Sequence, residues 1–180
     1  MSRLDPSVDA ARPQAAARVW LALVGWVALS LLAGAVGGLA SLNAREFYAT
    51  LIKPSWAPPG WLFGPAWTVL YVLMGVAAWL VWRERPLADD ATAAIRRRGL
   101  TLFVAQLALN ALWTWLFFYW RAGAWASGEI VVLWLAIAWV ALLFARVRGA
   151  AAWLLVPYLA WVTYATALTF AVWRANGERL

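Results

Sequence analysis

The chain has 180 residues, of which 66% are hydrophobic and 13% are charged, and its formal net charge is +7. Ordinary soluble domains are about 45–50% apolar and about 25% charged, so this composition excludes an ordinary soluble enzyme and a disordered chain, and it indicates an integral membrane protein. The chain contains 16 tryptophans but no cysteine and no histidine, which excludes thiol and imidazole chemistry, so neither a metal site nor a tightly bound cofactor is expected.

Long uncharged intervals predict an all-α membrane protein, a bundle of five transmembrane helices. Each interval exceeds the roughly 20 residues needed to cross the hydrocarbon core. Runs such as LALVGWVALSLLAGAVGGLA are apolar on every side, which favours helices over the alternating pattern of a membrane barrel. The five helices are expected at about 19–41, 62–82, 99–119, 126–145 and 151–173. They form one domain, 19–175, between a polar N-terminal tail, 1–18, and a C-terminal tail, 176–180.

Small residues recur along the first predicted helix. Ser30, Gly34 and Gly38 are spaced by four residues and therefore share one helix face. Small residues at this spacing let two membrane helices approach closely. The face fits either a homodimer contact or a contact with another helix of the same chain, and we favour the dimer.

The loop after the first helix, residues 43–61, is rich in proline and aromatic residues. Prolines from Pro54 to Pro65 forbid a regular helix across this stretch, while Trp56 and Trp61 make it apolar. Such a segment is either a lid over a cavity or an anchor among the lipid headgroups, and the residues alone favour the anchor. Arg45 and Lys53 are expected near the mouth of such a cavity, where they are candidates for pairing with an anionic ligand.

Charged residues predict the orientation in the membrane. The N-terminal tail and the second and fourth loops carry more lysine and arginine than the other side, which places the N-terminus in the cytoplasm and the C-terminus outside. Arginines beside anionic headgroups explain the positive charge, so no nucleic-acid partner is expected. In the second loop, Asp89 and Asp90 precede Arg96–Arg98, which predicts a short helix or an early start of the third span.

Polar and aromatic residues follow helical spacing inside three spans. Buried amides are unfavourable in a membrane unless they are bonded, so Gln106 and Asn110 are expected to point inward, toward a cavity or a neighbouring helix. Glu129 is a lone acid in the fourth span and is expected to cap its start. The three faces are Trp67, Tyr71 and Met74; Gln106, Asn110, Trp113 and Phe117; and Tyr158, Trp161, Ala165 and Leu168.

Five motifs together resemble the TspO/translocator protein family of tryptophan-rich sensory proteins, also called peripheral-type benzodiazepine receptor-like. They are KPSWAPPG at 53–60, AWTVLY at 66–71, QLALNALW at 106–113, PYLAWVTYATAL at 157–168 and VWRAN at 172–176. The resemblance implies a compact, usually dimeric five-helix bundle that binds porphyrins and other flat hydrophobic ligands between its helices, with the first loop as a lid. The implied ligand-binding residues are Tyr48, Trp56, Pro58, Trp67, Tyr71, Gln106, Asn110, Trp113, Trp161 and Ala165.

The expected function is that of a receptor-like membrane protein for a porphyrin such as protoporphyrin IX, with a regulatory or sensory role in tetrapyrrole handling. The expected partners are the lipid bilayer, the porphyrin and a second copy of the chain. A porphyrin or lipid transporter is one alternative, although no charged residue lies at mid-span. A structural scaffold is another. A third is light-dependent porphyrin degradation, in which the resemblance implicates Trp67 and Trp161 as reacting residues.

Overall fold

The computed structural model describes residues 6–85, 87, 89–177 and 179–180, and within them every regular element is helical. Five helices are long and apolar enough to cross a membrane, which confirms the all-α fold. The elements are α1 (Pro6–Ala40), α2 (Ala44–Thr50), η1 (Gly60–Leu62), α3 (Phe63–Arg83), α4 (Asp90–Thr114), η2 (Trp115–Tyr119), α5 (Gly123–Val147) and α6 (Gly149–Ala175).

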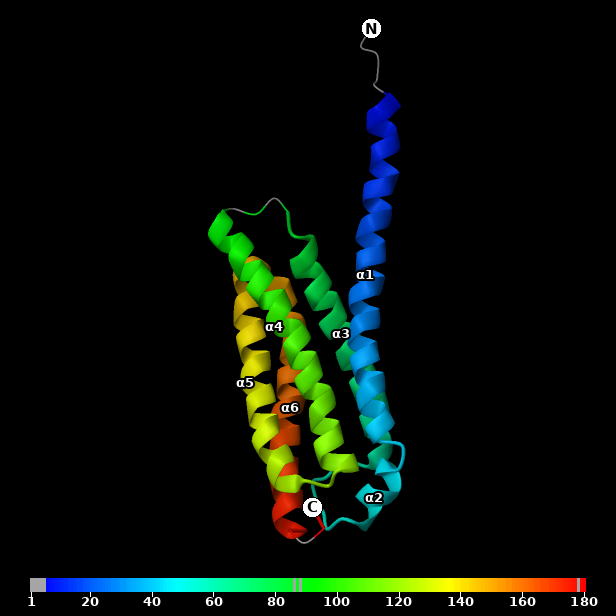
Figure 1. Ribbon diagram of the computed structural model, residues 1–180, viewed down its shortest axis with the longest axis vertical. Helices are drawn as coiled ribbons and strands as arrows, with labels where there is room; N and C mark the ends of the chain where they lie inside the picture. Colours follow the sequence, from blue (N-terminus) through cyan, green and yellow to red (C-terminus); the bar gives the residue numbers. More distant parts are fainter. Residues whose placement is uncertain (1–5, 86, 88, 178) are drawn as a thin grey trace.

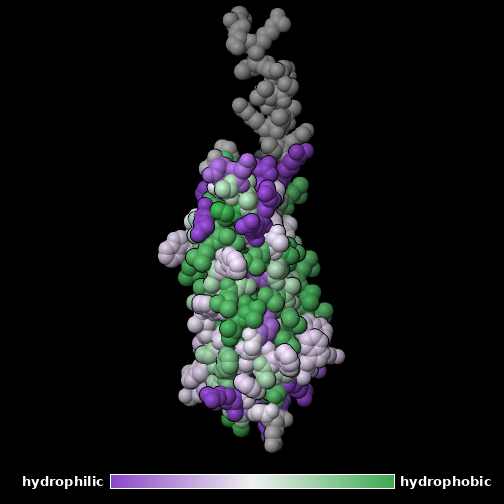
Figure 2. Space-filling model, turned by 60° about the vertical axis from the view of Figure 1, so that its left-hand side comes forward, coloured by the Kyte–Doolittle hydropathy of each residue, from purple (hydrophilic) through white to green (hydrophobic). Residues whose placement is uncertain are grey.

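The long helices run alongside one another (Figure 1), and their contacts close into a ring. Around the ring, α1 packs between α3 and α4, α6 packs between α3 and α5, and α4 contacts α5. The two ends of the chain lie at opposite ends of the bundle, as an odd number of spans requires. Figure 2 shows hydrophobic and weakly polar residues over the middle of the molecule and hydrophilic residues gathered toward the end where the N-terminus lies.

Helices α1 and α3 are in backbone contact at Gly75. A Cβ atom at this position would lie 2.6 Å from Cα and 2.9 Å from N of Val27. Helices in a membrane gain little from the hydrophobic effect against one another, so close packing of small residues holds them together. Glycine at position 75 therefore sets the distance between the two helices.

The small residues of α1 face different surroundings. Ser30 is fully buried within the single chain, and its hydroxyl donates to the carbonyl of Trp26. Gly34 lies against the ring of Tyr71 on α3, and an added Cβ would overlap that ring, whereas a Cβ at Gly38 would meet nothing within 4 Å. Gly34 therefore serves a contact inside the chain, the second of the two alternatives, and the homodimer stays a prediction.

Two helices, α1 and α4, begin much earlier than expected, and α5 and α6 begin two to three residues earlier. Helix α1 begins at Pro6, within the expected polar tail, and residues 1–5 lie outside the described part of the chain. Helix α4 begins at Asp90, which confirms an early start of the third span. The carboxylate of Asp89 caps it by accepting from the Thr92 N–H at 2.6 Å. This hydrogen bond lowers the pKa of Asp89 below its usual value.

The expectation that Glu129 caps the fourth span is wrong. Helix α5 begins at Gly123, so Glu129 lies beyond its first turn, where no backbone N–H is left free. Both carboxylate oxygens of Glu129 are buried and find no hydrogen-bond partner in the described part of the chain.

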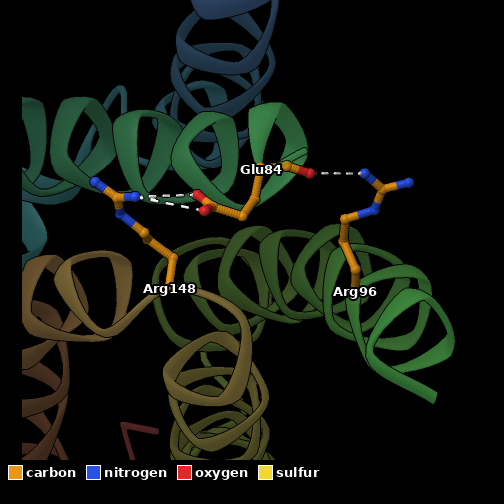
Figure 3. A network of polar contacts seen from close by, with 3 residues as sticks. All are labelled: Glu84, Arg96 and Arg148. Atoms are coloured by element: carbon orange, nitrogen blue, oxygen red, sulfur yellow. Dashed lines mark hydrogen bonds and ion pairs between the residues drawn. The ribbon is translucent and has the colours of Figure 1, made fainter. Parts of the chain in front are cut away.

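The end of the bundle away from α2 is joined by charged residues (Figure 3). Glu84, just after α3, pairs with Arg148 between α5 and α6 at 3.2 Å. Arg96 on α4 donates to the Glu84 carbonyl at 3.3 Å. One residue therefore links the end of α3 to three other helices.

Candidate functional site

Residues 43–61 fold across one end of the bundle as α2, an irregular segment with a turn closed by the Ala57 N–H on the Pro54 carbonyl, and the first two residues of η1 (Figure 1). The first proline of the loop is Pro54, so the residues before it are free to form α2, a helix that the sequence analysis did not predict. The Tyr48 hydroxyl donates to the Pro58 carbonyl at 3.2 Å, and the Lys53 ammonium donates to the carbonyls of Tyr48 and Leu51 at 2.6 and 2.9 Å. We call this segment the lid.

The lid is fastened to the C-terminal end of the chain by Asn176. The Asn176 Oδ1 accepts from the Ile52 N–H at 2.9 Å, and its Nδ2 donates to the Ile52 and Val172 carbonyls, both at 2.8 Å. Asn176 is only 5% exposed. The expected C-terminal tail therefore holds a clamp, which the sequence analysis missed. The sequence analysis placed Asn176 at the end of the VWRAN motif but assigned it no role.

Three further contacts hold the lid. Arg179 donates to the Thr50 carbonyl at 3.0 Å, and the Tyr164 hydroxyl of α6 donates to the Trp56 carbonyl at 2.9 Å. The guanidinium of Arg121, which follows η2, lies 4.7 Å from the ring centre of Phe47 on α2. Arg121 has a positive φ of 53°, a conformation that is unfavourable for a residue with a side chain. The turn between η2 and α5 thus presents its arginine to the lid.

A cavity of about 560 Å³ lies beneath the lid, between α1, α3 and the end of α4. We call it the lid cavity. Its volume is within the usual range for small-molecule sites, about 300–1,000 Å³. Small residues of α1, including Gly34 and Gly38, form one wall, and aromatic residues together with a few small and hydroxyl-bearing residues form the rest. The aromatic lining is Tyr48, Trp61, Phe63, Trp67, Tyr71, Trp113 and Phe118.

A second hollow, the outer groove, lies between α3 and α6 and has a volume of about 690 Å³. It is more open than the lid cavity and nearly free of polar atoms. Its walls include Pro58 of the lid and Trp161 of α6. The rings of Trp161 and Trp67 meet edge to face at 6.4 Å, so a wall residue of the outer groove contacts a wall residue of the lid cavity.

A hydrogen-bonded network lies behind the wall of the lid cavity. The Tyr71 hydroxyl donates to Asn110 Oδ1, and Asn110 Nδ2 donates to the Tyr158 hydroxyl at 3.0 Å. The Tyr158 hydroxyl donates to Gln106 Oε1 at 2.8 Å, and Gln106 Nε2 faces the Met74 sulfur at 4.0 Å. Both amides are buried, as their spacing predicts. They bond neighbouring helices and line neither hollow.

The predicted ligand-binding residues are therefore divided. Tyr48, Trp67, Tyr71 and Trp113 line the lid cavity, whereas Pro58 and Trp161 line the outer groove. The remaining four lie elsewhere. Gln106 and Asn110 form the network, Trp56 is exposed on the lid against Tyr164, and Ala165 packs on the core.

The two cations predicted at the mouth have different outcomes. Lys53 is engaged with lid carbonyls, and its ammonium lies 4.8 Å from the ring centre of Tyr48. The side chain of Arg45 lies outside the described part of the molecule. Burial raises the pKa of the Tyr48 hydroxyl above its usual value, and neighbouring Tyr164 adds to the shift. Tyr48 therefore stays protonated and keeps donating to the Pro58 carbonyl.

Comparisons with known proteins agree with this architecture. The sequence profile of the TspO/MBR family matches residues 26–174. Protein CrtK of Rhodobacter capsulatus is 42% identical over 148 residues, covering 82% of this chain and 88% of the relative. The translocator protein of Sus scrofa is 38% identical over 161 residues, covering 89% and 93%. The tryptophan-rich sensory protein of Cereibacter sphaeroides is 41% identical over 140 residues, covering 78% and 83%. The chain belongs to the TspO/MBR family.

Proposed function

We propose that this membrane protein is a receptor-like protein that binds a porphyrin in the lid cavity. The observation that carries the proposal is a cavity with aromatic walls under a lid fastened by partly buried hydrogen bonds. A porphyrin is a large flat π-system, and indole and phenol rings offer it stacking surfaces as well as polar edges. The lid cavity supplies both, whereas the outer groove is nearly free of polar atoms.

A sensory role accounts for the way the lid is held. The lid is bonded to α6 and to the residues after it, so a ligand that shifts the lid acts on the C-terminal end of the chain. A relative that shares 41% identity is named a tryptophan-rich sensory protein.

We place the N-terminus in the cytoplasm on the distribution of lysine and arginine, and we propose a homodimer as the working unit.

The test is a titration with protoporphyrin IX in detergent, followed by quenching of tryptophan fluorescence. Two matched variants test binding in the two hollows separately. Gly38→Trp fills the lid cavity, because a Cβ at Gly38 meets no atom within 4 Å. Ala160→Trp fills the outer groove. Saturable quenching at micromolar or lower concentration should be lost in Gly38→Trp and kept in Ala160→Trp.

The opposite pattern would place the ligand in the outer groove. Linear quenching that is identical in all three proteins would mean that porphyrin only partitions into the micelle, and the proposal would fall.

Light-dependent degradation of the bound porphyrin is a second candidate function. The observation in its favour is the contact between Trp67, which lines the lid cavity, and Trp161. Tryptophan is easily oxidised, so the pair offers an electron to an excited porphyrin in the presence of dioxygen. Illumination of the protein with protoporphyrin IX should consume the porphyrin faster than in Trp67→Phe/Trp161→Phe. Equal rates would reject this activity and leave the binding proposal standing.

A further inference from the structure

A series of neighbouring aromatic rings leads from the lid cavity to the outer surface of the lid. It starts at Trp67, which lines the lid cavity, and its further members are Trp161, Tyr164 and Trp56, in that order. The centres of successive rings are 6.4, 6.0 and 5.6 Å apart. All four rings are indoles or phenols, which give up an electron most readily among the aromatic side chains. We call this series the aromatic line.

The aromatic line ends at the surface of the molecule. Trp161 and Tyr164 are three residues apart on α6 and share a face, where both are partly buried in the wall of the outer groove. Trp56 is 48% exposed on the lid, so molecules dissolved in water can reach it without entering the cavity. The line therefore connects a cavity residue with a point that is open to a polar reactant.

Trp67 has two other oxidisable neighbours, Tyr71 and Tyr158, but neither leads to the surface. Their ring centres lie 5.5 and 6.1 Å from that of Trp67, and both residues are buried. Their hydroxyl groups donate to the amide oxygens of Asn110 and Gln106. A tyrosine that loses an electron also releases its phenol proton, and an amide oxygen is too weak a base to accept it. The hydrogen bond of the Tyr164 hydroxyl is exposed instead, so water can accept its proton.

The surroundings of Trp161 favour onward transfer. Its Nε1 is buried and has no hydrogen-bond partner among the residues that the structure describes. An indole that loses an electron becomes a cation with an acidic N–H, and a base bonded to that N–H removes the proton and leaves a weaker oxidant. No described residue offers such a base to Trp161, so its radical stays a cation and oxidises Tyr164.

The last step of the aromatic line requires the lid to be docked. The Tyr164 hydroxyl donates to the Trp56 carbonyl at 2.9 Å, and the two rings meet edge to face at 70°. Trp56 belongs to the lid, which Asn176 fastens to the end of α6. The cavity is therefore connected to the surface through these rings only while the lid is closed over it.

We propose that the aromatic line is an electron relay, through which a water-soluble one-electron reductant restores Trp67 after an excited porphyrin has oxidised it. This inference rests on the electron transfer from Trp67 that belongs to the second candidate function above. It adds the return path of the electron, and it gives Tyr164 and Trp56 a role as relay residues outside the ligand site.

One electron passes along the relay for each absorbed photon that leads to transfer. The excited porphyrin takes an electron from Trp67 and gives it to dioxygen, which becomes superoxide. The electron missing from Trp67 is replaced from the next ring along the line, and so on to Trp56. Tyr164 releases its proton to water when it is oxidised and regains a proton when it is reduced. A reductant of the ascorbate class gives Trp56 one electron and loses one proton to water, so the net transfer is one electron from the reductant to dioxygen.

The experiment illuminates the protein with bound protoporphyrin IX in air, with and without ascorbate. Peptide mass spectrometry measures the fraction of Trp67 that has gained oxygen. In the unmodified protein ascorbate should lower this fraction several-fold, because the relay reduces oxidised Trp67 before dioxygen adds to it. The sample without ascorbate is the reference for each protein and includes the damage that singlet oxygen causes directly.

Two variants interrupt the relay. Tyr164→Phe keeps a ring between Trp161 and Trp56 but replaces the phenol by a ring that does not give up an electron. It also removes the hydrogen bond to the lid. Trp56→Phe keeps that hydrogen bond, because the acceptor is the backbone carbonyl, and so separates loss of the relay from loosening of the lid. Ascorbate should give little or no protection of Trp67 in either variant.

Trp125→Phe is the matched control, because Trp125 is 76% exposed, lines neither hollow and takes no part in the aromatic line. It should keep the full protection by ascorbate. Flash photolysis of the unmodified protein needs no variant. It should show a tryptophan radical cation followed by a tyrosine radical, which decays faster when ascorbate is present.

Protection by ascorbate that is equal in all four proteins, or absent from the unmodified protein, would overturn the relay and leave porphyrin binding intact. If light oxidises no Trp67 although the porphyrin binds saturably, the second candidate function falls and this inference falls with it. Failure to bind protoporphyrin IX saturably would instead overturn the proposed function itself.

Discussion

The two ends of the bundle are joined by different chemistry. At the lid end, the Asn176 amide bonds both backbone groups of Ile52 in a nearly buried position. At the opposite end, Glu84 and Arg148 pair across 3.2 Å with side chains that are 30% and 43% exposed (Figure 3). An exposed ion pair contributes about 0–1 kcal/mol and is screened by salt. The partly buried amide bonds of Asn176 involve no net charge, so they demand one geometry and respond little to salt.

This difference indicates that the contacts at the lid end hold the lid in one position. The opposite end only joins helices that already pack along their length. A functional site needs the first kind of contact, because its lining residues must be fixed before a ligand arrives. Substitutions at four positions test this comparison, from the largest expected effect to the smallest.

Asn176→Ala should have the largest effect. It removes three hydrogen bonds and leaves the N–H and carbonyl of Ile52 without partners, so lid docking should weaken by about 2–3 kcal/mol. Hydrogen exchange of the amides in 44–62 should accelerate, and bound porphyrin should dissociate faster. Asn176→Asp keeps the oxygen that accepts from the Ile52 N–H. Its rates of exchange and dissociation should therefore lie between those of the unmodified protein and those of Asn176→Ala. Unchanged exchange in the lid would show that the clamp does not hold it.

Tyr164→Phe should weaken the same end by less. It removes the hydrogen bond to the Trp56 carbonyl but keeps a ring against Trp56 and Trp161. The expected loss is about 0.5–1 kcal/mol, seen as faster exchange near Trp56 with little change around Ile52. A loss as large as that of Asn176→Ala would mean that the lid is held mainly from α6.

Glu84→Gln tests the opposite end. It removes the charge that pairs with Arg148 but keeps the backbone carbonyl that accepts from Arg96. The thermal midpoint should change by less than it does in the lid variants, and the difference should vanish at high salt, since the expected contribution is about 0–1 kcal/mol. A large loss that salt does not reduce would contradict the contrast between the two ends.

Asp89 gives the smallest expected effect, a pH dependence confined to the start of α4. Its pKa is lowered by the hydrogen bond from Thr92, so its contribution is present above the usual aspartate pKa of about 3.9 and is lost as the pH falls through the lower value in the folded protein. The Thr92 amide signal in NMR should shift over that range. Asp89→Asn keeps a capping oxygen and should abolish the shift, and a shift that persists would have another origin.

Helix positions could be predicted because a long run that is apolar on every side can satisfy its backbone hydrogen bonds in lipid only as a helix. The acids Asp89 and Asp90 before Arg96–Arg98 predicted either a short helix or an early start of the third span, and the early start is the one that the structure has. Helical spacing predicted that the faces with Tyr71, Asn110 and Tyr158 meet at a shared pocket. The three residues do meet and bond one another, but Asn110 and Tyr158 line neither hollow. These features depend on local patterns, which can be recognised in a single sequence.

The missed features depend on how distant segments pack. Asn176 and Ile52 are 124 residues apart, and no local pattern pairs them. Trp161 was expected beside Trp67 in one pocket, and the rings do touch, but the crossing of α3 and α6 puts Trp161 on the outer groove. The position of Glu129 relative to the first turn of α5 depended on the residue at which α5 begins, and no charged residue indicates that residue in the sequence.

The most direct test of the account is the position of a bound metalloporphyrin in crystals grown from a lipidic phase with zinc protoporphyrin IX. Anomalous scattering at the zinc edge locates the metal without reference to the surrounding electron density. The account predicts one peak beneath the lid, between α1 and α3 and within contact distance of the lining that includes Trp67 and Trp113. A peak in the groove between α3 and α6, beside Pro157 and Trp161, would contradict it.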